Sequence, residues 1–237
     1  MIQPIIFIFL LVITFCGMSC KTQQVSTNNT PAPLTKQELA EGVKEMLVTG
    51  LDEGVQAIKD GELLNNSQLK IPFPKSLEKV EKSLKDIGLG DKLQEFVTAM
   101  NQTSTQVVQS TQPIFKSAIQ DMNLEEAQRI VNAGDGAATA YLRQRTEPHI
   151  INAVQPLMQK GLDNSKAAQL FSFLVNSYNK IPFVEPVNAD LSHYLTKMLI
   201  EALFFTIARK EYAIRHNPAV RTTVLLQRVF SEQLRSQ

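Results

Sequence analysis

Two stretches of the sequence gather side chains that could bind an anion or take part in polar catalysis. The first stretch, residues 134–145, places a glycine on either side of Asp135 and carries Arg143 farther along. Glycines at the start of a predicted helix leave backbone N–H groups open to an anion. Asp135 is also a typical helix-capping residue, and its negative charge would repel an anion there. A structural role for this stretch is therefore the stronger interpretation.

The second stretch, residues 209–223, collects basic side chains where one predicted helix ends and another begins. Lys and Arg near a helix C-terminus complement the helix dipole, so a structural role is favoured here as well. If the two stretches form a polar cleft, it is expected where they meet. The alternative is that Asp135 pairs there with Arg215 and Arg221, and that these residues bind no ligand. The candidate ligand-binding residues are Asp135, Arg143, Arg215, His216, Arg221 and Thr222.

The sequence contains none of the common catalytic or metal-binding motifs. His149, His193 and His216 lack the short spacing typical of zinc sites, and no paired-cysteine or calcium-loop pattern occurs. The glycine-rich loops of nucleotide sites and the Gly-x-Ser-x-Gly pattern of hydrolases are also absent. We therefore predict no catalytic residue, no metal site and no cofactor, and leave open whether the protein is an enzyme.

The N-terminal segment is typical of an export signal. Residues 5–13 are continuously apolar, which is shorter than the about 20 residues of a membrane-spanning helix. Ser19 supplies the small side chain that a signal peptidase requires, and Cys20 follows at the predicted cleavage point. We predict that residues 1–19 are a signal peptide and that Cys20 carries palmitate-type chains, as in bacterial lipoproteins. A simply secreted protein and an uncleaved anchor are the alternatives.

The segment after the apolar run is typical of a flexible tether. Residues 20–33 are polar and end among prolines, so they have little to bury in a core. Lys21, next to the acylated cysteine, resembles the pattern of lipoproteins sorted to an outer membrane. We expect a protein of the bacterial cell envelope that is held by lipid at the periplasmic face of the outer membrane. The membrane is then a partner through Cys20.

The composition argues against several other classes of partner. Lys and Arg number 24 against 23 Asp and Glu, so the balanced charge gives no reason to expect binding to nucleic acid. The two cysteines are Cys16 and Cys20, which leaves none for a disulfide or a thiolate in the rest of the chain. The folded domain must be held together by packing.

Residues 34–237 show apolar spacing typical of helices, without the sustained alternation of strands, and predict one all-α, bundle-like domain. Thr35 and Glu38 have the spacing of a capping box. Gly50 and Gly54, inside the first helix, either let a neighbouring helix approach closely or are simply tolerated. The helices are expected over 35–60, 76–87, 91–119 with a restart or kink at Pro113, 124–131 after an Asn cap, 137–145, from 146, 167–178, 190–208 as the buried centre, and from 217.

Several pieces of the sequence occur in a fixed order between residues 34 and 230. They are residues 71–80, 88–90, 100–101, 113–115, 134–139, 217–223 and 229–230. In this order they resemble an uncharacterised family of exported bacterial proteins, domain of unknown function 4197. The resemblance implies a helical domain located in the envelope, often behind a signal peptide, and it implies no particular activity.

Three functions are compatible with these observations. The favoured hypothesis is a non-enzymatic envelope lipoprotein that binds an unknown protein or small molecule. The alternative is an enzyme of unknown class whose polar site is formed by the Gly134–Gly136 loop and the Arg215–Thr223 segment. A third is a carrier that holds an apolar molecule in a cavity between helices.

Overall fold

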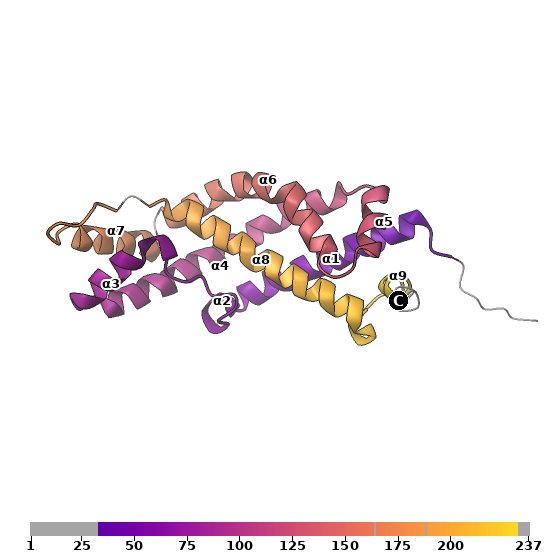
Figure 1. Cartoon of the computed structure of the whole chain (residues 1–237), viewed down its shortest axis with the longest axis horizontal. Coiled ribbons are helices and arrows are strands. Elements are labelled where there is room, and N and C mark those ends of the chain that lie inside the picture. Colours follow the sequence, from indigo (N-terminus) through magenta and orange to yellow (C-terminus); the bar gives the residue numbers. More distant parts are fainter. Residues whose placement is uncertain (1–32, 164, 188, 232–237) are drawn as a thin grey trace, which may run out of the picture. The chain divides into compact units, whose positions relative to one another are not determined.

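A computed structural model gives the fold of residues 33–163, 165–187 and 189–231. These residues form α-helices and two short 3-10 helices, with no strand among them, which confirms the predicted all-α class (Figure 1). In chain order the elements are α1 (Lys36–Lys59), α2 (Glu62–Asn65), η1 (Lys75–Leu77), α3 (Glu78–Asp86), α4 (Gly90–Gln120), α5 (Leu124–Asn132), α6 (Ala137–Leu162), α7 (Lys166–Tyr178), α8 (Leu191–His216), η2 (Pro218–Val220) and α9 (Val224–Ser231).

The long helices α1, α4, α6 and α8 form the centre of the domain. Helix α8 packs against α1 and α6, and α4 also packs against both of these helices. Their facing stripes bury large side chains such as Leu47, Phe115 and Phe204, each of which contributes about 1.5–3 kcal/mol by leaving water. The rings of Phe115 and Phe204 meet edge to face at 5.4 Å. The prediction that the α8 segment is a buried centre is confirmed.

The shorter helices cover different parts of these four. Helix α7 packs on α4 and contacts α3, whereas α5 and α9 pack on α1. Figure 1 shows α3 and α7 together near one end of α4, and α5 and α9 near the beginning of α1. The shorter helices are therefore positioned by their contacts with the long helices α1 and α4.

Helix α1 begins and packs as its sequence predicts. The Thr35 hydroxyl accepts a hydrogen bond from the Glu38 N–H at 3.1 Å, and the Glu38 carboxylate accepts one from the Thr35 N–H at 2.9 Å. This is the expected capping box. A Cβ added to Gly54 would lie 2.0 Å from the hydroxyl oxygen of Thr206 on α8. The glycine therefore permits the close approach of α1 and α8, as proposed for it.

Three prolines lie inside helices that continue through them. Pro113 is inside α4, and Pro148 and Pro156 are inside α6. We predicted a break near residue 146, and this prediction is wrong because α6 is continuous from Ala137 to Leu162. A proline in a helix interior costs about 3 kcal/mol. The prolines are exposed, while the same helices bury side chains on their opposite faces, and that packing outweighs the local cost.

Some predicted helix starts are displaced by a few residues. Helix α4 begins at Gly90, so Asp91 lies in its first turn and does not cap it. The segment after Asn217 forms only the short η2, and the last helix begins later, at Val224. Asn217 does cap η2, because its side chain accepts a hydrogen bond from the Ala219 N–H at 3.0 Å.

The predicted signal peptide, the acylated Cys20 and most of the tether lie outside the described residues. Within the residues that the structure does describe, no helix has the combination of length and hydropathy needed to cross a bilayer. The lipid anchor therefore stays a prediction from the sequence.

Candidate functional site

A buried carboxylate caps helix α6 from a distant part of the chain. Glu211 of α8 is fully buried, and its two oxygens accept hydrogen bonds from the N–H groups of Ala138 at 3.0 Å and Thr139 at 2.9 Å. The charge satisfies N–H groups that have no partner within the helix and complements the helix dipole. The sequence predicted Asp135 as the cap. That prediction is wrong, because Gly136 occupies the N-cap position with φ +74° and Glu211 supplies the carboxylate.

Arg215 joins α8 to α5 within the protein interior. Its side chain is 4% exposed, and its Nη2 lies 3.0 Å from Oε1 of Glu211. The same nitrogen donates to the carbonyl of Ile130 at 3.2 Å, in the last turn of α5. The guanidinium also lies 5.6 Å from the ring centre of Phe230. Arg215 is thus enclosed by protein groups and serves to hold three helices together.

Arg221 binds the C-terminal end of α8 in a similar way. It is 2% exposed, and it donates to the carbonyls of Ile214 at 2.7 Å and Arg215 at 2.9 Å. These carbonyls belong to the last turn of α8, where cationic side chains are stabilising. Burial lowers the pKa of the Arg221 guanidinium. We call Thr139, Glu211, Arg215 and Arg221 the polar corner.

Asp135 and His216 meet at the surface beside the polar corner. Nε2 of His216 lies 2.8 Å from Oδ2 of Asp135, and both side chains are 48% exposed. The histidine ring also packs on Tyr212, with 4.3 Å between ring centres. The sequence suggested Arg215 or Arg221 as the partner of Asp135, whereas the structure pairs it with His216. An exposed pair of this kind contributes about 0–1 kcal/mol to stability.

Arg143 and Thr222 do not contact the Asp135–His216 pair, and each lies in a different part of the domain. Arg143 of α6 contacts both oxygens of Glu201, at 2.5 and 2.9 Å, and its guanidinium lies 4.4 Å from the ring centre of Phe204. The hydrogen bond with Glu201 raises the pKa of Arg143. Thr222 is exposed in the segment between η2 and α9. Neither residue belongs to the polar corner.

The two stretches singled out by the sequence therefore meet, but through packed and hydrogen-bonded contacts. Arg143 lines a cleft of about 440 Å³ with Glu147 and Pro148. The other five candidates line none of the four main clefts in the described part of the chain. The charged groups of the polar corner bind other groups of the protein, so this region offers no open site for a ligand.

The largest of the four clefts is a groove of about 720 Å³ between α4 and α6, which we call the α4–α6 groove. Its volume lies within the about 300–1,000 Å³ typical of small-molecule sites. Its base is apolar, since Met122 and Ile150 are nearly fully buried and Ile114 and Ala118 are partly buried. The complete lining is Pro113, Ile114, Ser117, Ala118, Asp121, Met122, Tyr141, Arg145, Thr146, His149 and Ile150.

Regular helical spacing produces the two walls of the α4–α6 groove. On α6, Tyr141, Arg145 and His149 are four residues apart and so share one face. On the opposite wall, Ser117 and Asp121 have the same spacing. Arg145 and His149 are both exposed. One wall therefore offers two groups that can carry positive charge, and the other offers a hydroxyl and a carboxylate.

A buried glutamate holds part of the α6 wall in place. Glu126 accepts a hydrogen bond from the Tyr141 hydroxyl and another from the Asn123 N–H, and these bonds lower the pKa of its carboxyl. Burial, followed by the bond with Glu126, raises the pKa of Tyr141 to about 12. Nη2 of Arg145 lies 3.7 Å from Glu126, a long contact for an ion pair, and its side chain is 60% exposed. Arg145 therefore keeps most of its hydrogen-bonding capacity for other groups.

The α4–α6 groove can accept a molecule with an apolar part and a negatively charged end. Apolar atoms would displace water from the base, while the guanidinium of Arg145 and the imidazole of His149 would bind the charged end. Arg145 lies in the first stretch indicated by the sequence, whereas His149 was considered there only as a possible metal ligand. The four-residue spacing on each helix is visible in the sequence and indicates a shared face. It does not indicate that α4 and α6 are neighbours, so the groove could not be predicted from it.

Comparison with protein families relates this chain to a family of unknown function. A family described as "Protein of unknown function (DUF4197)" matches residues 33–231, a range that includes every residue the structure describes. No curated protein and no solved structure matches the chain.

Proposed function

The chain belongs to the DUF4197 family, and from this premise we propose that it is an envelope lipoprotein whose helical domain binds an anionic amphiphile in the α4–α6 groove. The proposed ligand has a hydrocarbon part and one carboxylate or phosphate-like group. Binding, with no chemical step, is the proposed activity.

One observation carries this proposal, namely the combination of an apolar base and a cationic wall in a 720 Å³ groove. Burying apolar surface provides about 25 cal/mol per Å², and a hydrogen-bonded charge at the rim fixes the orientation of the ligand. Asp121 lies on the opposite wall, where its carboxylate would repel a negative group. The anionic end of the ligand is therefore expected against Arg145 and His149.

The proposed location rests on the sequence. The short apolar segment, Ser19 and Cys20 support export and acylation, and the polar residues that follow support a tether. Several hydrocarbon chains on one cysteine would hold the protein durably at a membrane, because each buried CH₂ contributes about 0.8 kcal/mol. A protein at a bilayer surface meets amphiphiles at high local concentration, which suits the proposed ligand class.

Photolabelling tests the ligand site in the full chain. Cells that express the protein are given dodecanoic acid carrying a diazirine, are irradiated, and the labelled peptides are identified by mass spectrometry. Labels are expected on the parts of α4 and α6 that form the groove, within residues 113–122 and 141–150. Labels spread evenly over the other helices would overturn the proposal.

Two matched variants sharpen this test. Ala118→Phe fills the groove, whereas Ala153→Phe adds the same ring to an exposed position of α6 outside it. We expect labelling to fall at least about fivefold in the first variant and to stay unchanged in the second. The uncharged dodecanol analogue should label the groove less than the acid. Equal labelling of the two variants would contradict the proposed site.

Mass spectrometry of the purified protein tests the anchor separately. A mature N-terminus at Cys20 with attached acyl chains is expected. A native protein that begins at Met1 without fatty acid would overturn the proposed lipoprotein, while leaving the groove to be judged by photolabelling.

A further inference from the structure

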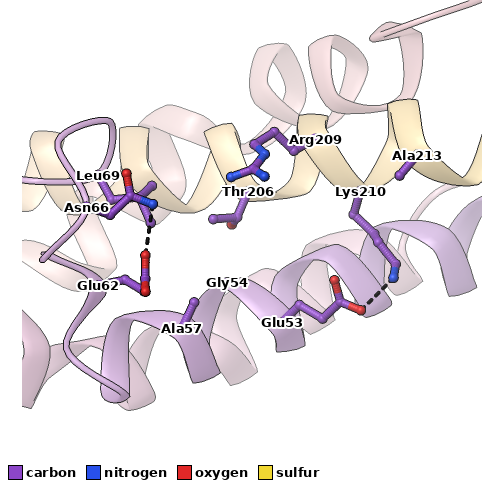
Figure 2. Close-up of a pocket in the computed structure, with 10 residues that line it drawn as sticks. All are labelled: Glu53, Gly54, Ala57, Glu62, Asn66, Leu69, Thr206, Arg209, Lys210 and Ala213. Atoms are coloured by element: carbon purple, nitrogen blue, oxygen red, sulfur yellow. Dashed lines mark hydrogen bonds and ion pairs between the residues drawn. The ribbon is translucent and has the colours of Figure 1, made fainter. Parts of the chain in front are cut away.

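A second cleft lies between α1, α2 and α8, and its lining differs entirely from that of the α4–α6 groove. Its volume is about 290 Å³, close to the lower limit for small-molecule sites. Figure 2 shows polar side chains from all three helices around it. The lining consists of Glu53, Gly54, Ala57, Glu62, Asn66, Leu69, Thr206, Arg209, Lys210 and Ala213.

The cleft sits where the backbones of α1 and α8 approach each other. A Cβ on Gly54 would clash with Thr206, and one on Gly50 would lie 2.9 Å from the Cα of Ile207. After this contact the chain turns at Gly61, whose φ is +95°, and α2 forms the far wall. Leu69, which is 4% exposed, contributes a buried apolar side chain to the lining. The cleft is thus defined by backbone packing.

The charges around the cleft divide into a pair and two separate groups. Nζ of Lys210 lies 2.6 Å from Oε1 of Glu53, so these two charges neutralise each other. Glu62 accepts a hydrogen bond from the neutral amide of Asn66 at 2.8 Å. Within the described part of the chain, neither Glu62 nor Arg209 forms an ion pair. One negative and one positive group therefore remain available to a ligand.

These two groups lie on different walls of the cleft. Figure 2 shows the guanidinium of Arg209 extending from α8 toward the side where Asn66 and Glu62 lie, and the Glu62 carboxylate on α2. The Arg209 guanidinium can bind a carboxylate with two parallel hydrogen bonds. A carboxylate such as that of Glu62 accepts hydrogen bonds from an ammonium group.

We infer that this cleft binds a small zwitterion of amino-acid or dipeptide size, with its carboxylate at Arg209 and its ammonium group at Glu62. A ligand with a single charge would leave one of the two protein charges facing it without a partner, which disfavours such a ligand. The Asn66 side chain, already bonded to Glu62, holds that carboxylate in position. The inference does not depend on the α4–α6 groove.

Calorimetric titration of the full chain in a neutral detergent tests this site. The probe is L-alanyl-L-alanine, and the comparison ligands are its N-acetyl derivative, which lacks the positive charge, and its amide, which lacks the negative charge. Binding of the dipeptide is expected to be at least about tenfold tighter than that of either derivative. No binding of the dipeptide, or equal binding of all three, would overturn the inference.

Charge variants identify the residues responsible. Arg209→Gln and Glu62→Gln are each expected to weaken dipeptide binding at least about tenfold, because each removes one charge-assisted contact. Arg129→Gln, which removes an exposed arginine of α5 outside the cleft, is the matched control and should change nothing. Circular dichroism checks that each variant is folded.

A space-filling variant gives an independent readout. Ala57→Leu adds apolar volume inside the cleft without changing any charge, and it should abolish dipeptide binding while photolabelling of the α4–α6 groove persists. Unchanged dipeptide binding in Ala57→Leu, or in both charge variants, would place the ligand elsewhere and contradict the proposed site.

Discussion

Two arginine–glutamate contacts in this protein have the same chemistry and opposite surroundings. In the polar corner, Arg215 lies 3.0 Å from Glu211, and the two side chains are 4% and 0% exposed. In the α4–α6 groove, Arg145 lies 3.7 Å from Glu126 and is 60% exposed. The first arginine has its hydrogen bonds within the protein, and the second can still reach a ligand. Exposure, more than residue type, separates structural charges from those available for binding.

Removing the buried charge should have the largest effect on stability. Glu211→Gln is expected to lower the free energy of unfolding by about 3–5 kcal/mol, because it leaves Arg215 buried without its anion and weakens the cap of α6. Chemical denaturation followed by circular dichroism measures the change. A loss below about 1 kcal/mol would mean that the polar corner does not hold the fold together.

The exposed arginine should affect binding instead. Arg145→Gln is expected to weaken binding of dodecanoate about tenfold, which is about 1.4 kcal/mol, and to change stability by less than about 0.5 kcal/mol. Competition against the diazirine label gives the affinity, and denaturation gives the stability. Gln144→Ala, an exposed neighbour outside the groove, is the control. A large loss of stability without a loss of affinity would show that Arg145 is a structural residue and contradict its proposed role in binding.

The free energy of unfolding should also depend on pH in the alkaline range, because of Tyr141 in the wall of the α4–α6 groove. The pKa of Tyr141 is raised from 10.0 to about 12 in the folded protein, so the stability it contributes is fully present below pH 10 and is lost as the pH rises to 12. After allowance for screening by solvent, the loss is on the order of 1 kcal/mol. Denaturation of the wild type and Tyr141→Phe at several pH values measures it. Parallel curves for the two proteins would refute this assignment.

The surface pair beside the polar corner should matter least. Asp135→Asn removes the negative partner of His216, yet both side chains are 48% exposed, so the expected loss is about 0–1 kcal/mol. Denaturation at neutral pH measures it alongside Glu211→Gln. A loss as large as that of Glu211→Gln would show that burial does not govern the difference between these contacts.

The fold was largely predictable because its signals are local. The capping box at Thr35, the cap at Asn123 and the apolar stripes follow from neighbouring residues, and the structure confirms them. The cap of α6 was missed because Glu211 lies 72 residues after Thr139, and only the packing of α8 brings them together. A break near Pro148 was predicted wrongly because local proline chemistry is overridden by a buried helix face.

The candidate site was less predictable for the same physical reason. Asp135 and His216 lie in the two stretches that were expected to meet, and they do meet. Basic residues clustered in sequence drew attention to Arg215 and Arg221, but sequence does not report that both are buried against carbonyl groups. The groove depends on α4 and α6 being neighbours, which is a contact between distant parts of the chain.

Identification of the molecule bound by the protein in its own cells tests the account most directly. The full chain, its Ala118→Phe variant and its Ala153→Phe variant are purified in parallel, and bound small molecules are extracted and identified by mass spectrometry. We predict an anionic amphiphile with the wild type and Ala153→Phe, and its loss from Ala118→Phe. Recovery of the same amount from all three proteins, or of no amphiphile from any, would contradict the α4–α6 groove as the functional site.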